Sequence, residues 1–381
     1  MSLIPAMHEH CFKFTRLFSH LRSFNRQNSI HTNQKGFPKR TKDPLQAGVT
    51  EVIDVRTPAE FKEDHIPGAI NLPVLDDKQR VKVGTLYSKS PFEGRKIGGG
   101  LVTAKIGEHI ENYFQHKPID YTPLIYCWRA GQRSMSMAMV LSQIGFDVYQ
   151  LEGGYKHYRQ TVRENIETVA PLMNYKMISG LTGSGKTMIL KKLGEHNQQV
   201  IDLEELAKHK GSILGIDADT TQPKQKYMES LLSLELSKFN SEKPVWLESE
   251  SRNIGSITIP NALFSKMKTC KRYVLNTPME ERVKHLLTEY PYWIKYPDRL
   301  KHILTILEKY CGKRLVEYWR DLIDQRKGEE FLESILVNHY DTTYYSSQKK
   351  NCAQRVEVVN IDVPNLSEET IYNVIIPQLL E

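Results

Sequence analysis

The chain has 381 residues, of which 40% are hydrophobic and 25% charged, the proportions of a globular protein large enough for two or three domains. No run approaches the roughly 18 to 20 apolar residues of a membrane-spanning helix, which argues against a membrane protein. The net charge of +7 suits a polyanionic partner, and five cysteines without a C-x-x-C spacing favour a reducing compartment and argue against structural zinc. We therefore expect a cytoplasmic protein.

The N-terminal stretch, residues 1–42, differs from the rest because it holds eight Lys/Arg residues and one acidic residue, Glu9. A basic leader with apolar residues at helical spacing is typical of an organelle transit peptide. The alternative is a disordered basic extension, which we favour because nothing marks a cleavage site. The folded chain is therefore expected to begin near Asp43.

The next segment, residues 43–165, alternates strands with a helix. The predicted elements are strands at 49–55, 123–126 and 148–151 and a helix at 134–144. Strands that alternate with helices indicate a parallel sheet with crossover connections. The segment is therefore predicted to be an α/β domain.

Cys127 is expected where a strand meets a helix, within Tyr-Cys-Trp-Arg-Ala-Gly-Gln-Arg-Ser. There the loop amides and the helix N-terminus converge on the thiol, and Arg129 and Arg133 add positive charge. Such surroundings favour a nucleophilic thiolate and can bind an anion, for which Gly131 and Ser134 are further candidates. The alternative is a buried structural cysteine, which the two arginines and the glycine make the weaker interpretation.

A second centre follows in residues 166–381. Gly180 is separated by four residues from Gly185-Lys186-Thr187, the spacing of a phosphate-binding loop, which would lie between a predicted strand at 175–178 and a helix. Loop amides and Lys186 would bind phosphate groups, and Thr187 is a candidate Mg²⁺ ligand. The expected diphosphate-binding residues are Gly180, Thr182, Gly183, Ser184, Gly185, Lys186 and Thr187.

The remainder of this second unit is predicted to be a P-loop NTPase-like α/β domain with a helical C-terminal part. Its other predicted strands are 200–202, 245–247, 272–275 and 356–361, and residues 278–340 are predicted to be mostly helical. Asp202 and Glu248 follow two of these strands, where ligand groups gather in parallel sheets. Because a Walker B aspartate is not evident, Glu248 is the nearest candidate for that role. Asp202 either assists a metal ion or caps the next helix.

Motifs on both sides of the cysteine loop resemble the rhodanese family. They are Asp54-Val55-Arg56-x-Pro58-x-Glu60-Phe61, His65-Ile66-Pro67-Gly68 and Leu151-Glu152-Gly153-Gly154-Tyr155. Rhodaneses carry sulfur or selenium on a loop cysteine, and ordinary sulfurtransferases have a C-x2-G-x-R loop. The present loop is longer, and its C-x5-R spacing from Cys127 to Arg133 also occurs in cysteine phosphatases. A longer loop fits a tetrahedral anion such as phosphate or selenophosphate.

The chain combines a rhodanese-like domain, this cysteine loop and a following phosphate loop. In this combination it resembles the tRNA 2-selenouridine synthase family. Three later segments match that family: Asp202-Leu203-Glu204, Glu248-Ser249-Glu250-Ser251-Arg252 and Tyr340-Asp341-x-x-Tyr344. The resemblance also places Gly98 and Arg252 near the substrates. Ala130 departs from the family, which usually has glycine there, and alanine disfavours a positive φ.

The resemblance implies replacement of sulfur by selenium in 2-thiouridine at the tRNA wobble position. It implies selenophosphate as the selenium donor, geranyl diphosphate as the second substrate and S-geranyl-2-thiouridine as the intermediate. Cys127 would act in the selenium step, and Arg129 and Arg133 would bind the selenophosphate anion. No tightly bound cofactor is expected, Mg²⁺ is a candidate ion, and the implied partners are tRNA and selenophosphate synthase.

Two other functions stay open from the residues alone. The C-x5-R spacing permits a rhodanese-fold cysteine phosphatase fused to a nucleotide-binding module, although a general acid is not evident. A non-catalytic, nucleotide-gated module that binds a persulfide or RNA is the third alternative.

Overall fold

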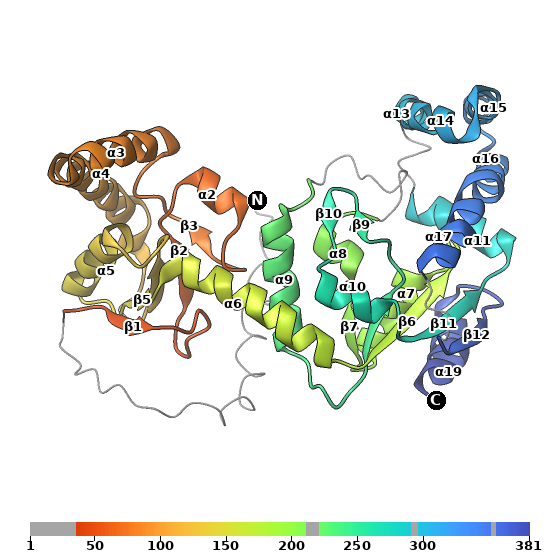
Figure 1. Ribbon diagram of the computed structural model, residues 1–381, viewed down its shortest axis with the longest axis horizontal. Coiled ribbons are helices and arrows are strands. Elements are labelled where there is room, and N and C mark those ends of the chain that lie inside the picture. Colours follow the sequence, from red (N-terminus) through yellow and green to blue (C-terminus); the bar gives the residue numbers. More distant parts are fainter. Residues whose placement is uncertain (1–35, 211–220, 291–295, 352–355) are drawn as a thin grey trace, which may run out of the picture.

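The computed structural model describes residues 36–210, 221–290, 296–351 and 356–381. Two five-stranded sheets, each with parallel pairing throughout, build two α/β domains that lie side by side (Figure 1). The predicted fold class is confirmed. Among the described residues, no helix is both long enough and apolar enough to cross a membrane.

The first sheet has the strand order β1-β5-β4-β2-β3. Its strands are β1 (Lys39–Thr41), β2 (Glu51–Asp54), β3 (Ile70–Asn71), β4 (Pro123–Tyr126) and β5 (Tyr149–Leu151). Its helical segments are α2 (Pro58–Glu63), α3 (Asp77–Lys89), α4 (Pro91–Asn112), η2 (Phe114–His116) and α5 (Gln132–Ile144). All four residues of β4 are buried, which explains the continuous apolar signal of this central strand.

The first domain begins earlier than predicted. Strand β1 lies within residues 1–42, yet it pairs in parallel with β5, and the amide of Lys39 donates to the carbonyl of Val148 at 2.8 Å. The strand has the sequence Lys-Arg-Thr, so it lacks the apolar signal by which the other strands were recognised. Backbone pairing at the sheet edge, rather than burial of apolar side chains, holds it in place.

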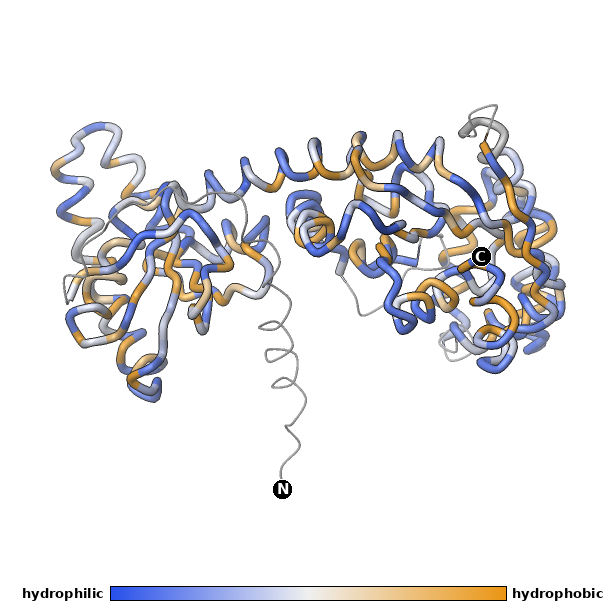
Figure 2. Tube along the Cα trace, turned by 90° about the horizontal axis from the view of Figure 1, so that it is seen from below, coloured by the Kyte–Doolittle hydropathy of each residue, from blue (hydrophilic) through white to orange (hydrophobic). Residues whose placement is uncertain are grey.

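Helix α6 (Gly154–Val169) joins the two domains and packs against α9 (Gln225–Ser237) (Figure 1). Its buried positions 155, 158, 162 and 166 follow helical spacing, and polar residues alternate with them along the helix in Figure 2. Tyr155 and Tyr158 belong to the same apolar cluster as Met228 and Leu232 of α9. The domains therefore share a continuous core along this helix pair.

A buried carboxylate adds polar contacts to this interface. Asp64, from the first domain, is fully buried and accepts hydrogen bonds from the hydroxyls of Tyr155 at 2.8 Å and Ser230 at 2.9 Å. Ser230 lies on α9. Glu229, also on α9, forms an ion pair with Arg159 of α6. Burial raises the pKa of Asp64, although its hydrogen-bond donors act in the opposite direction.

The second sheet has the order β12-β11-β6-β8-β7. Its strands are β6 (Tyr175–Gly180), β7 (Gln199–Ile201), β8 (Val245–Glu248), β11 (Lys271–Asn276) and β12 (Val358–Asp362). A separate antiparallel pair consists of β9 (Asn253–Ile254) and β10 (Ile257–Thr258). The helical segments around the sheet are η3 (Ala170–Leu172), α7 (Lys186–Glu195), α8 (Leu203–Ala207), α10 (Asn261–Met267), α18 (Glu368–Thr370), η7 (Ile371–Ile375) and α19 (Ile376–Leu380).

The predicted helical part extends from α11 to α17. It comprises α11 (Met279–Glu289), α13 (Pro297–Leu304), η5 (Thr305–Leu307), α14 (Glu308–Cys311), α15 (Lys313–Asp324), α16 (Gly328–Ile335), the π-helical η6 (Leu336–Asp341) and α17 (Thr342–Asn351). Trp319 is fully buried in a core that includes Leu304, Val316 and Ile335 and is separate from the core of the sheet. This subdomain carries one wall of the functional cavity.

Candidate functional site

The phosphate loop connects the end of β6 to the start of α7, as the sequence predicted. Gly183 has a φ of +82°, and a Cβ there would lie 3.0 Å from the carbonyl oxygen of Arg282. Gly185 has a φ of +81° and a Cβ there would meet Leu366 at 2.6 Å, so glycine is required at both positions. These tight turns direct the loop toward the N-terminus of α7, where anions bind favourably.

Most of the predicted diphosphate-binding residues line a single cavity of about 1240 Å³. Those at its surface are Thr182, Gly183, Gly185, Lys186 and Thr187. Gly180 and Ser184 instead border a smaller cavity on the other side of the loop. The Lys186 ammonium donates to the carbonyls of Gly180 at 3.2 Å and Leu181 at 3.4 Å, so it lies against the loop where a phosphate group would accept from it.

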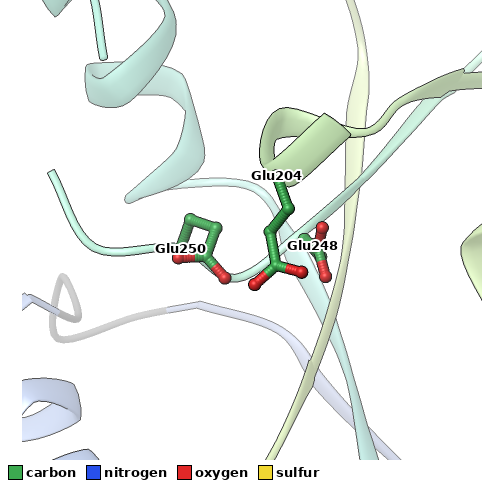
Figure 3. Close-up of side chains that lie close together, drawn as sticks. All are labelled: Glu204, Glu248 and Glu250. Carbon is green, nitrogen blue, oxygen red and sulfur yellow. The ribbon is translucent and has the colours of Figure 1, made fainter. Parts of the chain in front are cut away.

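Three carboxylates face one another beside Thr187: Glu204 from α8, Glu248 from the end of β8, and Glu250 just beyond (Figure 3). Each offers an oxygen within 4.8 Å of the others, and the Thr187 hydroxyl donates to Glu248 at 2.8 Å. Burial, together with the neighbouring carboxylates, raises the pKa of each of the three to about 8. One oxygen of Glu248 is buried without a hydrogen-bond partner.

These features fit a magnesium ion. Mg²⁺ prefers oxygen ligands, and a divalent charge would offset the repulsion that raises the carboxyl pKa values. Glu248 was identified from its position after β8, whereas Glu204 was known only as part of a family segment. Glu204 comes close because α8 starts directly after the neighbouring strand β7, which places its first turn at the same sheet edge.

Asp202, Arg252 and Gly98, which were also predicted to lie near the substrates, occupy three different places in the structure. Asp202 caps α8 by accepting from the amide of Glu205 at 2.8 Å, and it also lines the cavity. Arg252 is exposed and donates to Asn261 at 2.8 Å, so it is not part of the cavity wall. Gly98 lies in α4 of the first domain, where a Cβ would meet Val83 of α3 at 2.9 Å, so glycine lets the two helices pack closely there.

The helical subdomain is bonded to the phosphate loop through Arg282, a residue that was not predicted from the sequence. Arg282 is buried, its Nε donates to the carbonyl of Thr182 at 2.8 Å, and its Nη atoms pair with Asp341 at 2.6 and 3.0 Å. The amide of Gly180 donates to the hydroxyl of Tyr344 at 3.0 Å. Asp341 and Tyr344 of the Tyr340-Asp341-x-x-Tyr344 segment therefore help to hold the phosphate loop in its conformation, Asp341 through Arg282 and Tyr344 directly.

The cavity is large and chemically mixed. Its volume of about 1240 Å³ lies above the roughly 300 to 1,000 Å³ that small-molecule sites usually occupy. Apolar and aromatic parts of its wall are Met177, Phe264, Met267, Leu286, Tyr290 and Tyr310. Basic parts are Lys191, Lys208, Lys210, Lys268 and Arg272. Such a wall suits a chain of hydrocarbon attached to a polyanion.

Cys127 lies at the end of β4, buried at the base of the second loop. Its Sγ accepts from the amide of Gly131 at 3.3 Å and from the hydroxyl of Ser134 at 3.2 Å. Gln150, which sequence reasoning missed, donates to Ser134 at 2.9 Å and holds that hydroxyl in place. The predicted convergence of hydrogen-bond donors on the sulfur of Cys127 is therefore present.

The two arginines of the loop differ. Arg129, two residues after Cys127, is exposed, whereas Arg133 donates to Glu60 at 2.8 Å. Burial alone would raise the Glu60 pKa, but the hydrogen bond and charge of Arg133 hold it below the usual range. Arg133 thus already has an anionic partner, which leaves Arg129 as the more available cation for an incoming anion.

The start of α6 supports the cysteine loop from below. The amides of Tyr155 and Lys156 donate to the carbonyls of Cys127 at 2.8 Å and Trp128 at 2.9 Å. Gly154 lies so close that a Cβ would meet the Cys127 oxygen at 2.3 Å. The cysteine loop is at one end of α6, which is about 24 Å long, and the phosphate loop belongs to the domain at its other end.

Comparison with known proteins agrees with this arrangement. The family model described as the tRNA 2-selenouridine synthase AAA domain matches residues 173–362, and the rhodanese-like domain model matches residues 37–161. Proteins named tRNA 2-selenouridine synthase are similar over most of the chain. One from Shewanella pealeana is 31% identical over 80% of this chain and 90% of its own.

Two further relatives carry the same name. The protein from Shewanella denitrificans is 35% identical over 75% of this chain and 77% of its own length. That from Nitrosomonas europaea is 32% identical over 63% of both chains. The predicted order, a rhodanese-like domain followed by a P-loop-type α/β domain, is confirmed by both family matches.

Proposed function

This chain belongs to the tRNA 2-selenouridine synthases, enzymes that act on tRNA, and we propose that it converts wobble 2-thiouridine to 2-selenouridine in two steps. In the first step, the thiocarbonyl sulfur attacks C1 of geranyl diphosphate and diphosphate leaves. In the second, the selenium of selenophosphate forms a bond to C2 of the alkylated base, the C2–S bond breaks, and geranylthiolate leaves and takes up a proton. Water then cleaves the Se–P bond and releases phosphate. Selenophosphate synthase is the proposed source of the donor.

The main support for the first step is that the phosphate loop lines a wide cavity whose wall is partly apolar. Lys186 and the loop amides would bind the diphosphate and stabilise the charge that develops as it leaves. Met177, Phe264 and Met267 offer apolar surface in the same cavity for the prenyl chain.

Magnesium is proposed to bind at Thr187 and the three carboxylates. When bound, it supplies positive charge next to the diphosphate oxygens. Thr187 and Glu248 are already joined by a hydrogen bond, so their side chains need little rearrangement to become ligands. In this proposal, Glu204, Glu248 and Glu250 bind the ion, and Lys186 binds the diphosphate.

The second step is assigned to the cysteine loop. Cys127, with donors from Gly131 and Ser134, would hold the selenium species, and Arg129 would bind its phosphate group. Alkylation makes C2 more electrophilic and turns sulfur into a stable thiol leaving group, so the order of the steps follows from their chemistry. The target base must leave its stack to reach either site.

Omission of single components tests the scheme. Purified protein is incubated with 2-thiouridine tRNA, geranyl diphosphate, Mg²⁺ and selenophosphate, each left out in turn, and nucleosides are analysed by mass spectrometry. S-geranyl-2-thiouridine should accumulate without selenophosphate. A requirement for ATP in place of geranyl diphosphate would refute the assignment of the phosphate loop.

Two variants separate the sites. Lys186→Ala should abolish both products, whereas Cys127→Ala should block selenation and leave geranylation. Cys270→Ala is the matched control, because Cys270 is a half-buried thiol outside both loops. Full selenation by Cys127→Ala would remove that thiol from the mechanism, and Cys127-dependent hydrolysis of an aryl phosphate would instead favour a phosphatase.

A further inference from the structure

A thiol and an imidazole lie against one another in the wall of the phosphate-loop cavity. Cys311 ends α14 and His339 lies in the π-helical segment η6, and the Cys311 Sγ is 3.4 Å from the His339 Nδ1. Both residues line the cavity. Short π-helical segments are rare and frequently occur at functional sites.

The surroundings favour the neutral forms of both groups. Burial raises the pKa of the Cys311 thiol and lowers the pKa of the His339 imidazole. When the Nδ1–H of a neutral imidazole donates to the sulfur, the lone pair is on Nε2, so this nitrogen can accept a proton. The pair thus resembles a base and the group that orients it.

Alkylation of 2-thiouridine at sulfur requires such a base, because the product has one proton fewer. The sulfur forms a bond to C1 of the prenyl chain, and the C1–O bond breaks with its electrons passing to the diphosphate. The N3–H bond also breaks, and its electron pair forms the N3=C2 double bond as C2=S becomes C2–S. The proton from N3 must pass to an acceptor.

We propose that His339 Nε2 is this acceptor in the geranylation step and that Cys311 is its positioning residue. The inference rests on the proposed function of the cavity. The helical subdomain then supplies a catalytic group in addition to its contacts with the phosphate loop. The target base would lie between η6 and the phosphate loop.

Two other histidines line the same cavity but suit the role less well. Burial lowers the pKa of His285; the charge of Glu289 acts in the opposite direction, and the ammonium groups of Lys210 and Lys186 disfavour protonation further. His209 has its Nδ1 buried without a hydrogen-bond partner, so no group orients its ring. His339 combines access to the cavity with a group bound to Nδ1.

The test is single-turnover formation of S-geranyl-2-thiouridine without selenophosphate. His339→Gln should lower the rate constant about 100-fold or more, while geranyl diphosphate binds as tightly as to wild type. His339→Ala should lose as much and recover part of the rate when imidazole is added. His302→Gln, at an exposed position on α13, is the matched control and should react as wild type does.

The positioning role of Cys311 has its own signature. Cys311→Ala should lower kcat with little change in KM, and Cys311→Ser, which keeps an acceptor, should restore most of the loss. A wild-type rate in His339→Gln, or a failure of imidazole to rescue His339→Ala while His285→Gln or His209→Gln abolishes the reaction, would overturn the assignment. Absence of the S-geranyl product with wild-type protein would instead refute the proposed function itself.

Discussion

The buried Arg282 and the partly buried Asp341 form an ion pair that connects the helical subdomain to the phosphate loop. The side chain of Arg282 is 3% exposed; its Nη2 lies 2.6 Å from Asp341, and its Nε donates to the Thr182 carbonyl. One side chain therefore links α11, η6 and the loop that is proposed to bind diphosphate. The position of the subdomain and the shape of the loop are coupled through this pair.

Removing one partner of this pair should weaken both stability and binding. Asp341→Ala leaves the Arg282 charge buried and uncompensated, a change that costs about 3 kcal/mol of the free energy of unfolding. We expect this loss in urea unfolding and a lower affinity for geranyl diphosphate in calorimetry. Asp324→Ala is the matched control, since its ion pair with Lys301 is 61% exposed on the Asp324 side and should cost less than about 1 kcal/mol. Equal effects of the two substitutions would contradict the proposed coupling.

Magnesium should stabilise the wild-type protein through the three carboxylates. An ion that binds the folded state raises the thermal midpoint, so Mg²⁺ should raise it for wild type and not for Glu248→Gln. Without Mg²⁺, the substitution should not destabilise the protein, because it removes one of three crowded carboxyl groups. Glu242→Gln, on an exposed loop, is the control and should respond to Mg²⁺ as wild type does. A Mg²⁺ response that persists in Glu248→Gln would place the ion elsewhere.

The sequence predicted the parts of the site that local spacing determines. The phosphate loop and Cys127 each lie between a strand and a helix, and a local motif is sufficient to place such residues. Glu248 was also predicted, because its strand end was visible from the apolar run before it. Strand β1 was missed, since backbone pairing rather than apolar side chains holds it in the sheet.

Contacts between distant segments could not be predicted in this way. Arg282 and Asp341 are far apart in the sequence, and no local pattern indicates that they meet. Arg133 was expected to bind an anion from outside, but Glu60 of α2 supplies a carboxylate. Gly98 was expected near the substrates, yet the close approach that it permits is to Val83 of α3. In each case the partner is set by tertiary packing, which a single sequence does not specify.

Two glycine substitutions should separate strain from steric contact in the cysteine loop. Ala130 has a φ of +53°, so Ala130→Gly should relieve strain and stabilise the protein by up to about 1 kcal/mol. Gly154→Ala should destabilise it and abolish selenation, because the Cβ would meet the Cys127 carbonyl and the Ala130 amide. Thermal unfolding and selenation assays check both. Gly48→Ala is the matched control, since Gly48 also has a positive φ, of +87°, but a Cβ there has open space, and a loss equal to that of Gly154→Ala would show that the contact is not the cause.

Asp64 should make the interface between the domains sensitive to pH. Burial raises its pKa in the folded protein, so the folded state holds a proton that the unfolded chain releases. The stability that this group contributes is present at low pH and is lost as pH rises through the folded-state pKa. The thermal midpoint of wild type minus that of Asp64→Asn should therefore fall as pH rises from about 4 and then level off. Glu63→Gln, at a half-exposed neighbouring position, should show no such trend. A difference that grows with pH would mean that the hydroxyls of Tyr155 and Ser230 stabilise the ionised carboxylate more than burial opposes it.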